Sequence, residues 1–292
     1  MLIDAHVHIA LNNVFDAKQW NASDREKKQE WIRQIFMEYT KLGIRAVRDG
    51  GDALFVSAFA REIAEEVGID YRSPVFAVYK SGHYGSFLGR PVNDMDDFRR
   101  EFKALLEYKA DHLKIILTGI VNFEYGDVGE TAFTFEQLKF MTETAKEHDM
   151  PVMVHANGRE GVSAAIRAGV DSIEHGYLMS EEEIHGIAES GIVWVPTLSP
   201  LANILESEDG RFEKQKGVIR KVYEGQVQNL KKAAELGVGI ALGSDAGAYM
   251  VPHGKGILDE MRHFEEAGFT GEEIAGMIEK FQKSCLMRKY SG

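Results

Sequence analysis

The segment that first indicates a fold is Leu2-Ile-Asp-Ala-His-Val-His8. It is short and rich in aliphatic and β-branched residues, as buried strands are. Similar runs recur along the chain, and most are followed by a charged stretch with helical periodicity. The sequence therefore predicts eight strands, over Leu2–His8, Ile44–Arg48, Val75–Tyr79, His112–Leu117, Pro151–His155, Ser172–His175, Ile192–Pro196 and Val238–Leu242.

Helices are predicted between these strands and after the last one. Several of them end at a glycine that lies just before the next strand, as helix C-caps do. These glycines are Gly43, Gly68, Gly169, Gly191 and Gly237. The predicted helices cover about Glu26–Leu42, Ala53–Val67, Met95–Lys109, Phe135–His148, Gly161–Ala168, Glu181–Ser190, Lys216–Leu236, Ile257–Ala267 and Gly271–Lys289.

Strands that alternate with helices are typical of parallel βαβ units, and eight such units form a (β/α)8 barrel. A doubly wound open sheet is the competing architecture, but it normally shows a glycine-rich turn after its first strand, and this sequence has none there. The 292 residues fit the usual size of a barrel, and no Ser/Pro/Gly-rich linker divides them. We therefore expect an α/β fold with one TIM barrel domain over residues 1–292 and its chemistry at the C-terminal ends of the strands.

The composition excludes several classes of protein. Hydrophobic residues make up 44% of the chain and charged residues 27%, as in globular proteins. The formal net charge of −12 disfavours nucleic acid as a partner. Cys285 is the only cysteine, so no internal disulfide is expected. No apolar run approaches the ~20 residues of a membrane span and no signal peptide is recognisable, so we expect a cytoplasmic protein that acts on a small molecule.

Ionisable residues gather at the predicted strand ends. His6 and His8 lie two apart on the first strand, so their side chains point to the same face. His155 and His175 end the fifth and sixth strands, Asp245 follows the eighth, and Lys114 lies in the fourth. Each alone could be structural. Together, neutral imidazoles and a carboxylate on one rim predict a site for Zn²⁺ or a similar divalent ion.

Lys114 is flanked by leucine and isoleucines, an environment in which a charged amine is costly to bury. Desolvation can lower the pKa of such a lysine by several units. As a neutral amine it could act as a base, or react with CO₂ to give a carbamate that bridges two metal ions. It could also pair with a buried acid and contact no metal.

These segments together resemble the amidohydrolase superfamily of metal-dependent hydrolases, and most closely its imidazolonepropionase-like and prolidase-like branch. The resemblance covers nearly the whole chain, through Asp4–His8, His112–Lys114, Val154–Asn157, Ser172–Gly176 and Leu242–Gly247. Most members carry a small β-sandwich beside the barrel, and we expect none here because the histidine pair begins at residue 6.

The resemblance implies a role for each residue of the rim. His6 and His8 would hold a more buried metal ion, and His155 and His175 a more exposed one. Carboxylated Lys114 would bridge the two ions, and Asp245 would bind metal and move protons.

Three further residues would contact the substrate. The segment Ser81-Gly-His-Tyr-Gly85 is similar to a Gly-Gly-His-Gly loop of the family, so His83 would contact the substrate or steady the transition state, with Tyr84 beside it. A histidine on a surface loop is the alternative. Asn157 stands where prolidase-like members tend to have Tyr, and is the third expected contact.

The implied reaction is hydrolysis of an amide or cyclic amide C–N bond, in a dipeptide, N-acyl amino acid or lactam. Water bound to a metal can have its pKa lowered from 15.7 to about 7, which supplies hydroxide at neutral pH. Alternatives are a mononuclear deaminase, a phosphotriesterase or lactonase, and a catalytically silent metal-binding barrel. Deaminases of the superfamily usually keep a glutamate near the fifth-strand histidine, where this chain has Ala156-Asn-Gly158.

Two long connections lie on the same rim. The segment Ser199–Gly217 is long for a strand-to-helix connection and could be a lid or a functionless insertion. The segment Tyr249–Gly256 contains His253, which we do not expect to bind metal. The sequence leaves open whether the chain forms a homo-oligomer.

Overall fold

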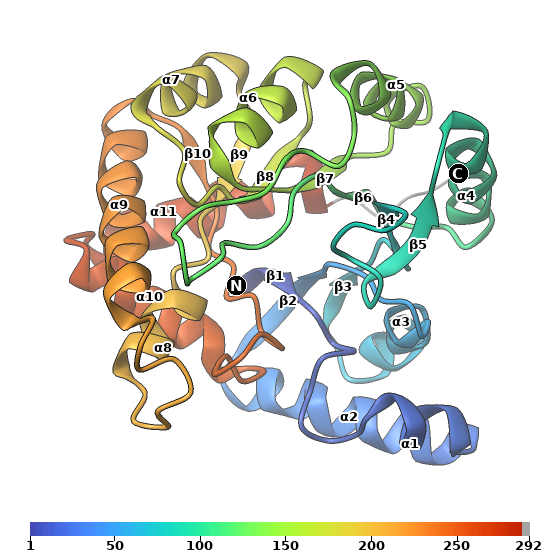
Figure 1. Cartoon of the computed structure of the whole chain (residues 1–292). Helices are drawn as coiled ribbons and strands as arrows, with labels where there is room; N and C mark the ends of the chain where they lie inside the picture. The colour runs from blue at the N-terminus through green and yellow to red at the C-terminus, as the bar shows by residue number, and fades with distance from the viewer. Residues whose placement is uncertain (288–292) are drawn as a thin grey trace.

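The computed structural model describes residues 1–287 and has a barrel of parallel strands surrounded by helices (Figure 1). The strands are buried along nearly their whole length, which explains their continuous apolar sequences. They are β1 (Leu2–Val7), β2 (Ile44–Asp49), β3 (Asp70–Arg72), β4 (Ala77–Lys80), β5 (Gly89–Val92), β6 (Leu113–Ile116), β7 (Val152–Ala156), β8 (Ser172–His175), β9 (Val193–Val195) and β10 (Gly239–Ile240).

The strands form two parallel sheets, in the orders β1-β2-β3 and β10-β9-β8-β7-β6-β4-β5. The sheets meet on one side, where Val7 pairs with Ala246 and the Asp245 amide donates to the His6 carbonyl at 2.8 Å. On the other side the chain passes from β3 to β4 through Val75, whose φ is +65°. That left-handed residue interrupts the hydrogen-bond ladder, so the barrel is not closed by continuous pairing there.

All eight predicted strand positions are occupied, with two differences. The third strand, predicted over Val75–Tyr79, is present as β4, and β3, which precedes the turn at Val75, has no counterpart in the prediction. The strand β5 has no counterpart in the prediction. It is an edge strand beside β4 and contains Pro91, which is tolerated at an edge but weakens a strand pattern in the sequence.

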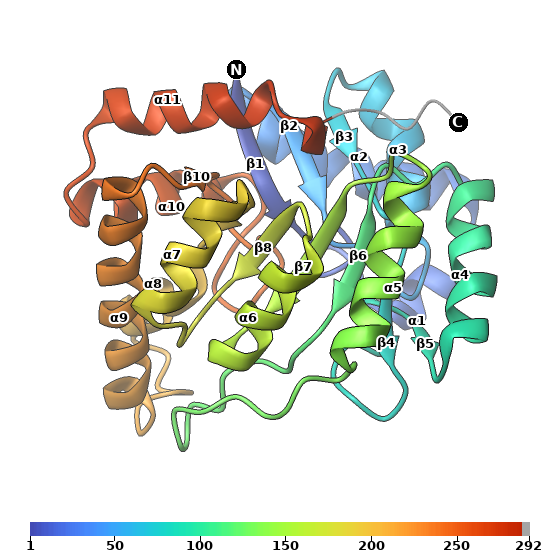
Figure 2. The same cartoon turned by 90° about the horizontal axis from the view of Figure 1, so that it is seen from above.

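The helices cover the outside of the barrel (Figure 1). The helix α11 instead crosses the amino-terminal ends of the strands (Figure 2), where Phe281 packs in a small core with Ile3 and Ala241. The opposite, carboxyl end is therefore the end left for a site. The helices are α1 (Ala17–Ala22), α2 (Arg25–Lys41), α3 (Val56–Glu66), α4 (Met95–Glu107), α5 (Phe135–Lys146), α6 (Gly158–Ala168), α7 (Glu181–Ser190), α8 (Ser199–Glu206), α9 (Lys216–Glu235), α10 (Lys255–Glu266), α11 (Gly271–Gln282) and the 3-10 turn Cys285–Met287.

The predicted helices are all present, and the five predicted capping glycines have positive φ. Some helices were not predicted, and some predicted helices have different boundaries. The helix α1 has no predicted counterpart, and α6 begins at Gly158, three residues before its predicted start. The last helix, predicted to end at Lys289, ends at Gln282, and residues 288 and 289 lie outside the described part of the chain.

The connection Ser199–Gly217 is not a plain loop, because its first half is the helix α8. The Glu260 carboxylate on α10 accepts from the Leu198 and Ser199 amides at 2.9 and 2.7 Å and so satisfies the start of α8. This cap comes from a residue about sixty positions away, which explains why local patterns did not predict it. Across residues 1–287, none of the helices has the length and apolar character that crossing a bilayer requires.

Candidate metal centre

The six predicted ligands come together at the carboxyl end of the barrel. His6 is on β1 and His8 directly follows it, while Lys114, His155 and His175 lie on β6, β7 and β8. Asp245 lies beyond β10, in the segment that pairs with β1. All of these side chains are buried except that of Asp245, which is 15% exposed.

His6, His8 and Asp245 converge on one point. The two Nε2 atoms are 3.3 Å apart, and each lies 3.5 Å from Asp245 Oδ1. Their ligand atoms are close enough to hold one ion. Asp245 has a φ of +59°, a conformation that costs about 1–3 kcal/mol and is common at functional sites. Gly50 leaves space for His8, since a Cβ there would lie 2.2 Å from His8 Cε1.

His155 and His175 extend this group. Their ring centroids are 4.6 Å apart, and His175 is 4.9 Å from the ring of His6. The four imidazoles therefore form a continuous row. His175 also has a left-handed backbone, with a φ of +68°.

In each of three imidazoles one ring nitrogen has a hydrogen-bond partner in the protein, and the other ring nitrogen is left to bind a metal ion. His6 Nδ1 lies 2.6 Å from Glu174 Oε2, and His175 Nδ1 lies 2.8 Å from Thr197 Oγ1. His155 Nε2 lies 3.2 Å from the Gly119 carbonyl. When each of these nitrogens donates its proton, the lone pairs of His6 Nε2, His175 Nε2 and His155 Nδ1 are free to bind a metal.

Lys114 is 1% exposed, and its Nζ has no hydrogen-bond partner among residues 1–287. Burial lowers the pKa of this amine to about 8. No carboxylate within the described chain lies in ion-pair distance of it, so the buried-acid alternative for Lys114 has no geometric support. A buried amine without a partner is costly unless something is attached to it or neutralises it.

Burial also fixes the charge state of the other groups. It lowers the pKa of His8 and of His155 to about 3, and it lowers the pKa of His6 and His175 well below the ordinary value. These imidazoles are therefore neutral, as metal ligands must be. Burial raises the pKa of Asp245 to about 7. Four neutral nitrogen donors and a carboxylate are suitable ligands for divalent metal ions.

A buried ion pair behind the site was not predicted. Arg48 Nη2 donates to Glu174 Oε1 at 2.8 Å, and both side chains are almost fully buried. The same carboxylate accepts from Ser172 Oγ at 2.6 Å while its other oxygen faces His6. Arg48 thus holds Glu174, which orients His6. The available signal was a glutamate within the buried run Ser172–His175 and an arginine at the end of the second strand.

Removing one partner of this pair should destabilise the protein. We expect Glu174→Gln to lower the free energy of unfolding by about 3 kcal/mol, because the buried Arg48 guanidinium loses its carboxylate. Urea denaturation of the metal-free protein measures this. Glu206→Gln is the control, because it breaks an exposed pair with Arg262 and should cost less than about 1 kcal/mol. Equal effects of the two variants would contradict a structural role for the Arg48–Glu174 pair.

A cavity of about 350 Å³ opens over the ligand group. Tyr84 lines it and packs at 5.6 Å from the ring of His155. Asn157 also lines it, but its Nδ2 lies 3.2 Å from the Gly119 carbonyl and its Oδ1 accepts from the Tyr177 amide. Asn157 therefore has protein partners for its amide, and its predicted substrate contact stays a prediction.

His83 is placed apart from the other predicted residues. Its side chain is exposed and it is not among the residues that line the cavity. Its role as a transition-state contact stays a prediction. In the arrangement described, we expect His83→Ala to lower kcat by less than about threefold, whereas loss of an oxyanion contact lowers it about 10²-fold or more. Steady-state kinetics on a cleaved amide would separate the two, and a hundredfold loss would show that the loop brings His83 to the substrate.

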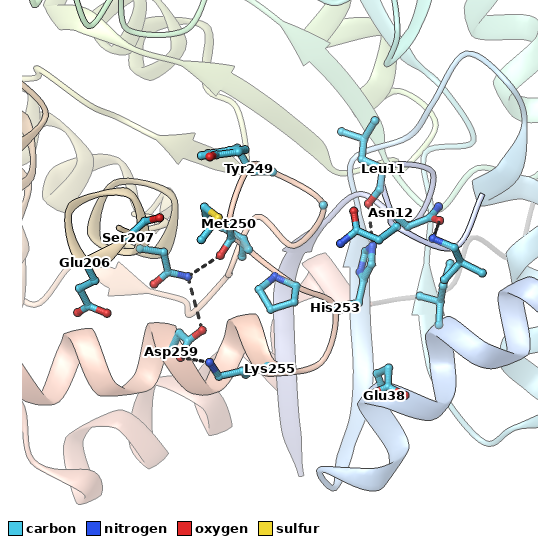
Figure 3. A pocket seen from close by; sticks show the side chains of 18 of the residues that line it. Leu11, Asn12, Glu38, Glu206, Ser207, Tyr249, Met250, His253, Lys255 and Asp259 are labelled. Carbon is cyan, nitrogen blue, oxygen red and sulfur yellow. Dashed lines mark hydrogen bonds and ion pairs between the residues drawn. The ribbon is translucent and has the colours of Figure 1, made fainter. Parts of the chain in front are cut away.

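A second, larger cavity of about 910 Å³ adjoins the first (Figure 3). The two share Leu11, Gly247, Ala248 and Tyr249 in their walls. His253 lines the outer cavity and lies 2.8 Å from Tyr39 Oη and 2.9 Å from the Leu11 carbonyl. These contacts join three separate segments, in line with the prediction that His253 is not a metal ligand.

One other cluster on the described chain has metal-ligand spacing, formed by Glu206, His263 and Glu266. Its two carboxylates already pair with the Arg262 guanidinium at 2.8 Å. The cluster is an ion-pair network on the surface and has no need of a cation.

Comparison with known proteins identifies the family of this chain. Residues 2–278 match the sequence profile described as "Amidohydrolase family". Ochratoxinase from Aspergillus niger is 27% identical over 200 residues, which are 65% of this chain and 41% of that protein. The chain thus matches less than half the length of this relative.

Solved structures agree on the fold. A crystal structure of a Xaa-Pro dipeptidase with bound methionine in the active site superposes with a TM-score of 0.75 at 26% identity, covering 99% of this chain and 77% of the other. The crystal structure of A. niger ochratoxinase gives a TM-score of 0.77 at 22% identity, covering 94% and 68%. These likenesses confirm the predicted TIM barrel.

Proposed function

This chain belongs to the amidohydrolase family, and from that premise we propose that it hydrolyses an amide C–N bond with two divalent metal ions. Members of this superfamily generally bind divalent metals, and the names of the relatives are those of hydrolases. The single observation that carries the proposal is the buried Lys114 beside the row of imidazoles, whose Nζ has no hydrogen-bond partner among residues 1–287. A carbamate on this lysine that binds metal would account for this position.

The residues divide between two ions. His6 and His8 would hold one, and His155 and His175 the other, through the nitrogens that their hydrogen bonds leave free. Lys114, as its carbamate, would bridge the two ions, and Asp245 would bind metal beside His6 and His8. Zinc is the ion we propose, because imidazole and carboxylate are the ligands of catalytic zinc sites. When bound, the ions would supply a Lewis acid for the carbonyl and lower the pKa of a water molecule.

The chain's own residues would then orient the reactants and move the proton. Asp245, which lies 3.5 Å from two of the imidazoles, is placed to accept a proton from the attacking water and return it to the leaving amine. Glu174 and Thr197 keep the rings of His6 and His175 in place. Phe87, Phe212 and Tyr249 line the cavity above and would reduce the contact of the reacting groups with water.

A hydrolysis screen with metal analysis tests the proposal. The purified protein is assayed on dipeptides, N-acyl amino acids and lactams, before and after chelation and after zinc is restored. We expect amide cleavage that disappears with the metal and returns with zinc. Ammonia release from amines instead would favour a deaminase, and cleavage confined to lactones or phosphotriesters would favour those activities. Metal binding without any turnover would favour a silent metal-binding barrel.

A further inference from the structure

The lining of the inner cavity differs sharply from its floor. The floor is formed by the metal-binding group, whereas the walls are almost entirely apolar. Leu201 and Ile204 come from α8, and Ile120 and Phe123 come from the connection after β6. Leu201, Ile204 and Phe123 belong to a hydrophobic cluster separate from the main core of the barrel. A substrate in this cavity therefore meets mostly apolar, uncharged side chains around the reacting bond.

Three aromatic rings from different connections extend the apolar walls. Phe123 and Phe212 meet at 5.9 Å and nearly at right angles, and Phe212 meets Tyr249 at 5.5 Å. Phe123 follows β6, Phe212 follows α8 and Tyr249 follows β10. Such edge-to-face contacts are favourable, so the three connections stabilise one another over the cavity.

Charged side chains are missing from these walls. Apart from the predicted ligands, no described residue lining the inner cavity is a lysine, arginine, aspartate or glutamate. The adjoining outer cavity is different, because Glu38, Lys255 and Arg262 line it (Figure 3 shows the first two). Among the described residues, Lys114 is the only cationic side chain that lines the inner cavity, and the proposed function uses it for metal binding.

From this contrast we propose that the site selects amides that are uncharged on both sides of the scissile bond, with apolar groups flanking it. This inference rests on the proposed function and names its substrate class: capped, apolar N-acyl amides in preference to free dipeptides. In a free dipeptide the ammonium and the carboxylate each lie only one carbon away from the scissile amide group. Both would be desolvated against the apolar walls, and burial of a charge without a partner is costly.

A set of four substrates with the same scissile bond tests the proposal. These are acetyl-Leu-Ala-amide, its two singly capped forms and free Leu-Ala, with cleavage between Leu and Ala followed by mass spectrometry. We expect kcat/KM to be highest for the doubly capped form and at least about tenfold lower for the free dipeptide, since one poorly paired buried charge costs more than 1.4 kcal/mol.

Two results would contradict different parts of the account. If free Leu-Ala is cleaved as well as the capped form, in a metal-dependent reaction, the substrate inference is wrong and the hydrolase proposal stands. If no amide of the series or of the wider screen is cleaved, the proposed function itself fails.

A pair of variants at Ile120 tests the electrostatic cause. Ile120 lines the cavity yet is 58% exposed, so a long polar side chain there should not disturb folding. We expect Ile120→Arg to shift the ratio of kcat/KM values toward the substrate with a free carboxylate, compared with Ile120→Gln. The two variants have side chains of similar polarity and differ in charge. Equal ratios in the two variants would contradict the idea that missing cations exclude the carboxylate.

Discussion

Asp245→Asn is expected to lower kcat by about 10³-fold or more, because the carboxylate that we propose to move protons between water and the leaving amine loses its basicity. Its Oδ1 lies 3.5 Å from the Nε2 atoms of both His6 and His8, so the amide oxygen of asparagine can still fill the same position. Steady-state kinetics on the best substrate of the screen would measure the loss. A variant that keeps wild-type turnover would remove Asp245 from the mechanism.

The free energy of unfolding of Asp245→Asn shows whether a loss of activity is caused by a loss of structure. Burial raises the pKa of Asp245 to about 7, so in the metal-free protein its carboxylate destabilises the fold progressively as the pH rises from about 4 to 7. Metal-free Asp245→Asn should therefore be at least as stable as the wild type at pH 8, and the difference should vanish near pH 4. Asp171→Asn is the matched control for activity, since Asp171 lies at the opposite end of β8 and should leave kcat unchanged.

Lys114→Gln is expected to lower both activity and metal content. Loss of a group that only orients a metal ligand typically costs about 10–100-fold in metal affinity or activity, so loss of a ligand to both ions should cost at least about 100-fold in kcat. Elemental analysis after reconstitution should show that the metal content falls from two ions per chain toward one. A variant with two ions and full activity would show that Lys114 does not bind metal.

An experiment can distinguish a carbamate on Lys114 from a free amine. Metal-free wild type reconstituted in buffer depleted of CO₂ should recover less activity than protein reconstituted with bicarbonate. The Lys114→Met variant should fold at least as well as the metal-free wild type, because it replaces a buried amine that has no hydrogen-bond partner among residues 1–287. Equal recovery with and without bicarbonate would favour a neutral amine.

The sequence predicted the barrel and the members of the ligand group because both follow from short patterns. Each strand is a buried apolar run, and ionisable residues at its carboxyl end indicate a functional site at that end of the barrel. His6 and His8 are two apart on one strand, so their convergence required no knowledge of tertiary structure. The conclusion that strand ends share one rim then brought His155, His175 and Asp245 to the same place.

Contacts between segments that are distant in the sequence could not be predicted from such short patterns. Glu174 looks like an ordinary strand residue until Arg48, on another strand, is seen to pair with it. The helix α8 depends on the Glu260 carboxylate at its start, and the break between β3 and β4 depends on a left-handed Val75. Loop placement was equally unpredictable, because the fold alone does not determine that Tyr84 lines the cavity while the adjacent His83 is exposed.

The most direct test of the central claim is an anomalous difference map from crystals of zinc-loaded protein, recorded at the zinc absorption edge. We expect two peaks per chain, one beside His6, His8 and Asp245 and one beside His155 and His175, with Lys114 in contact with both. No peak at the carboxyl end of the barrel, or density only at the surface cluster of Glu206 and Glu266, would contradict it.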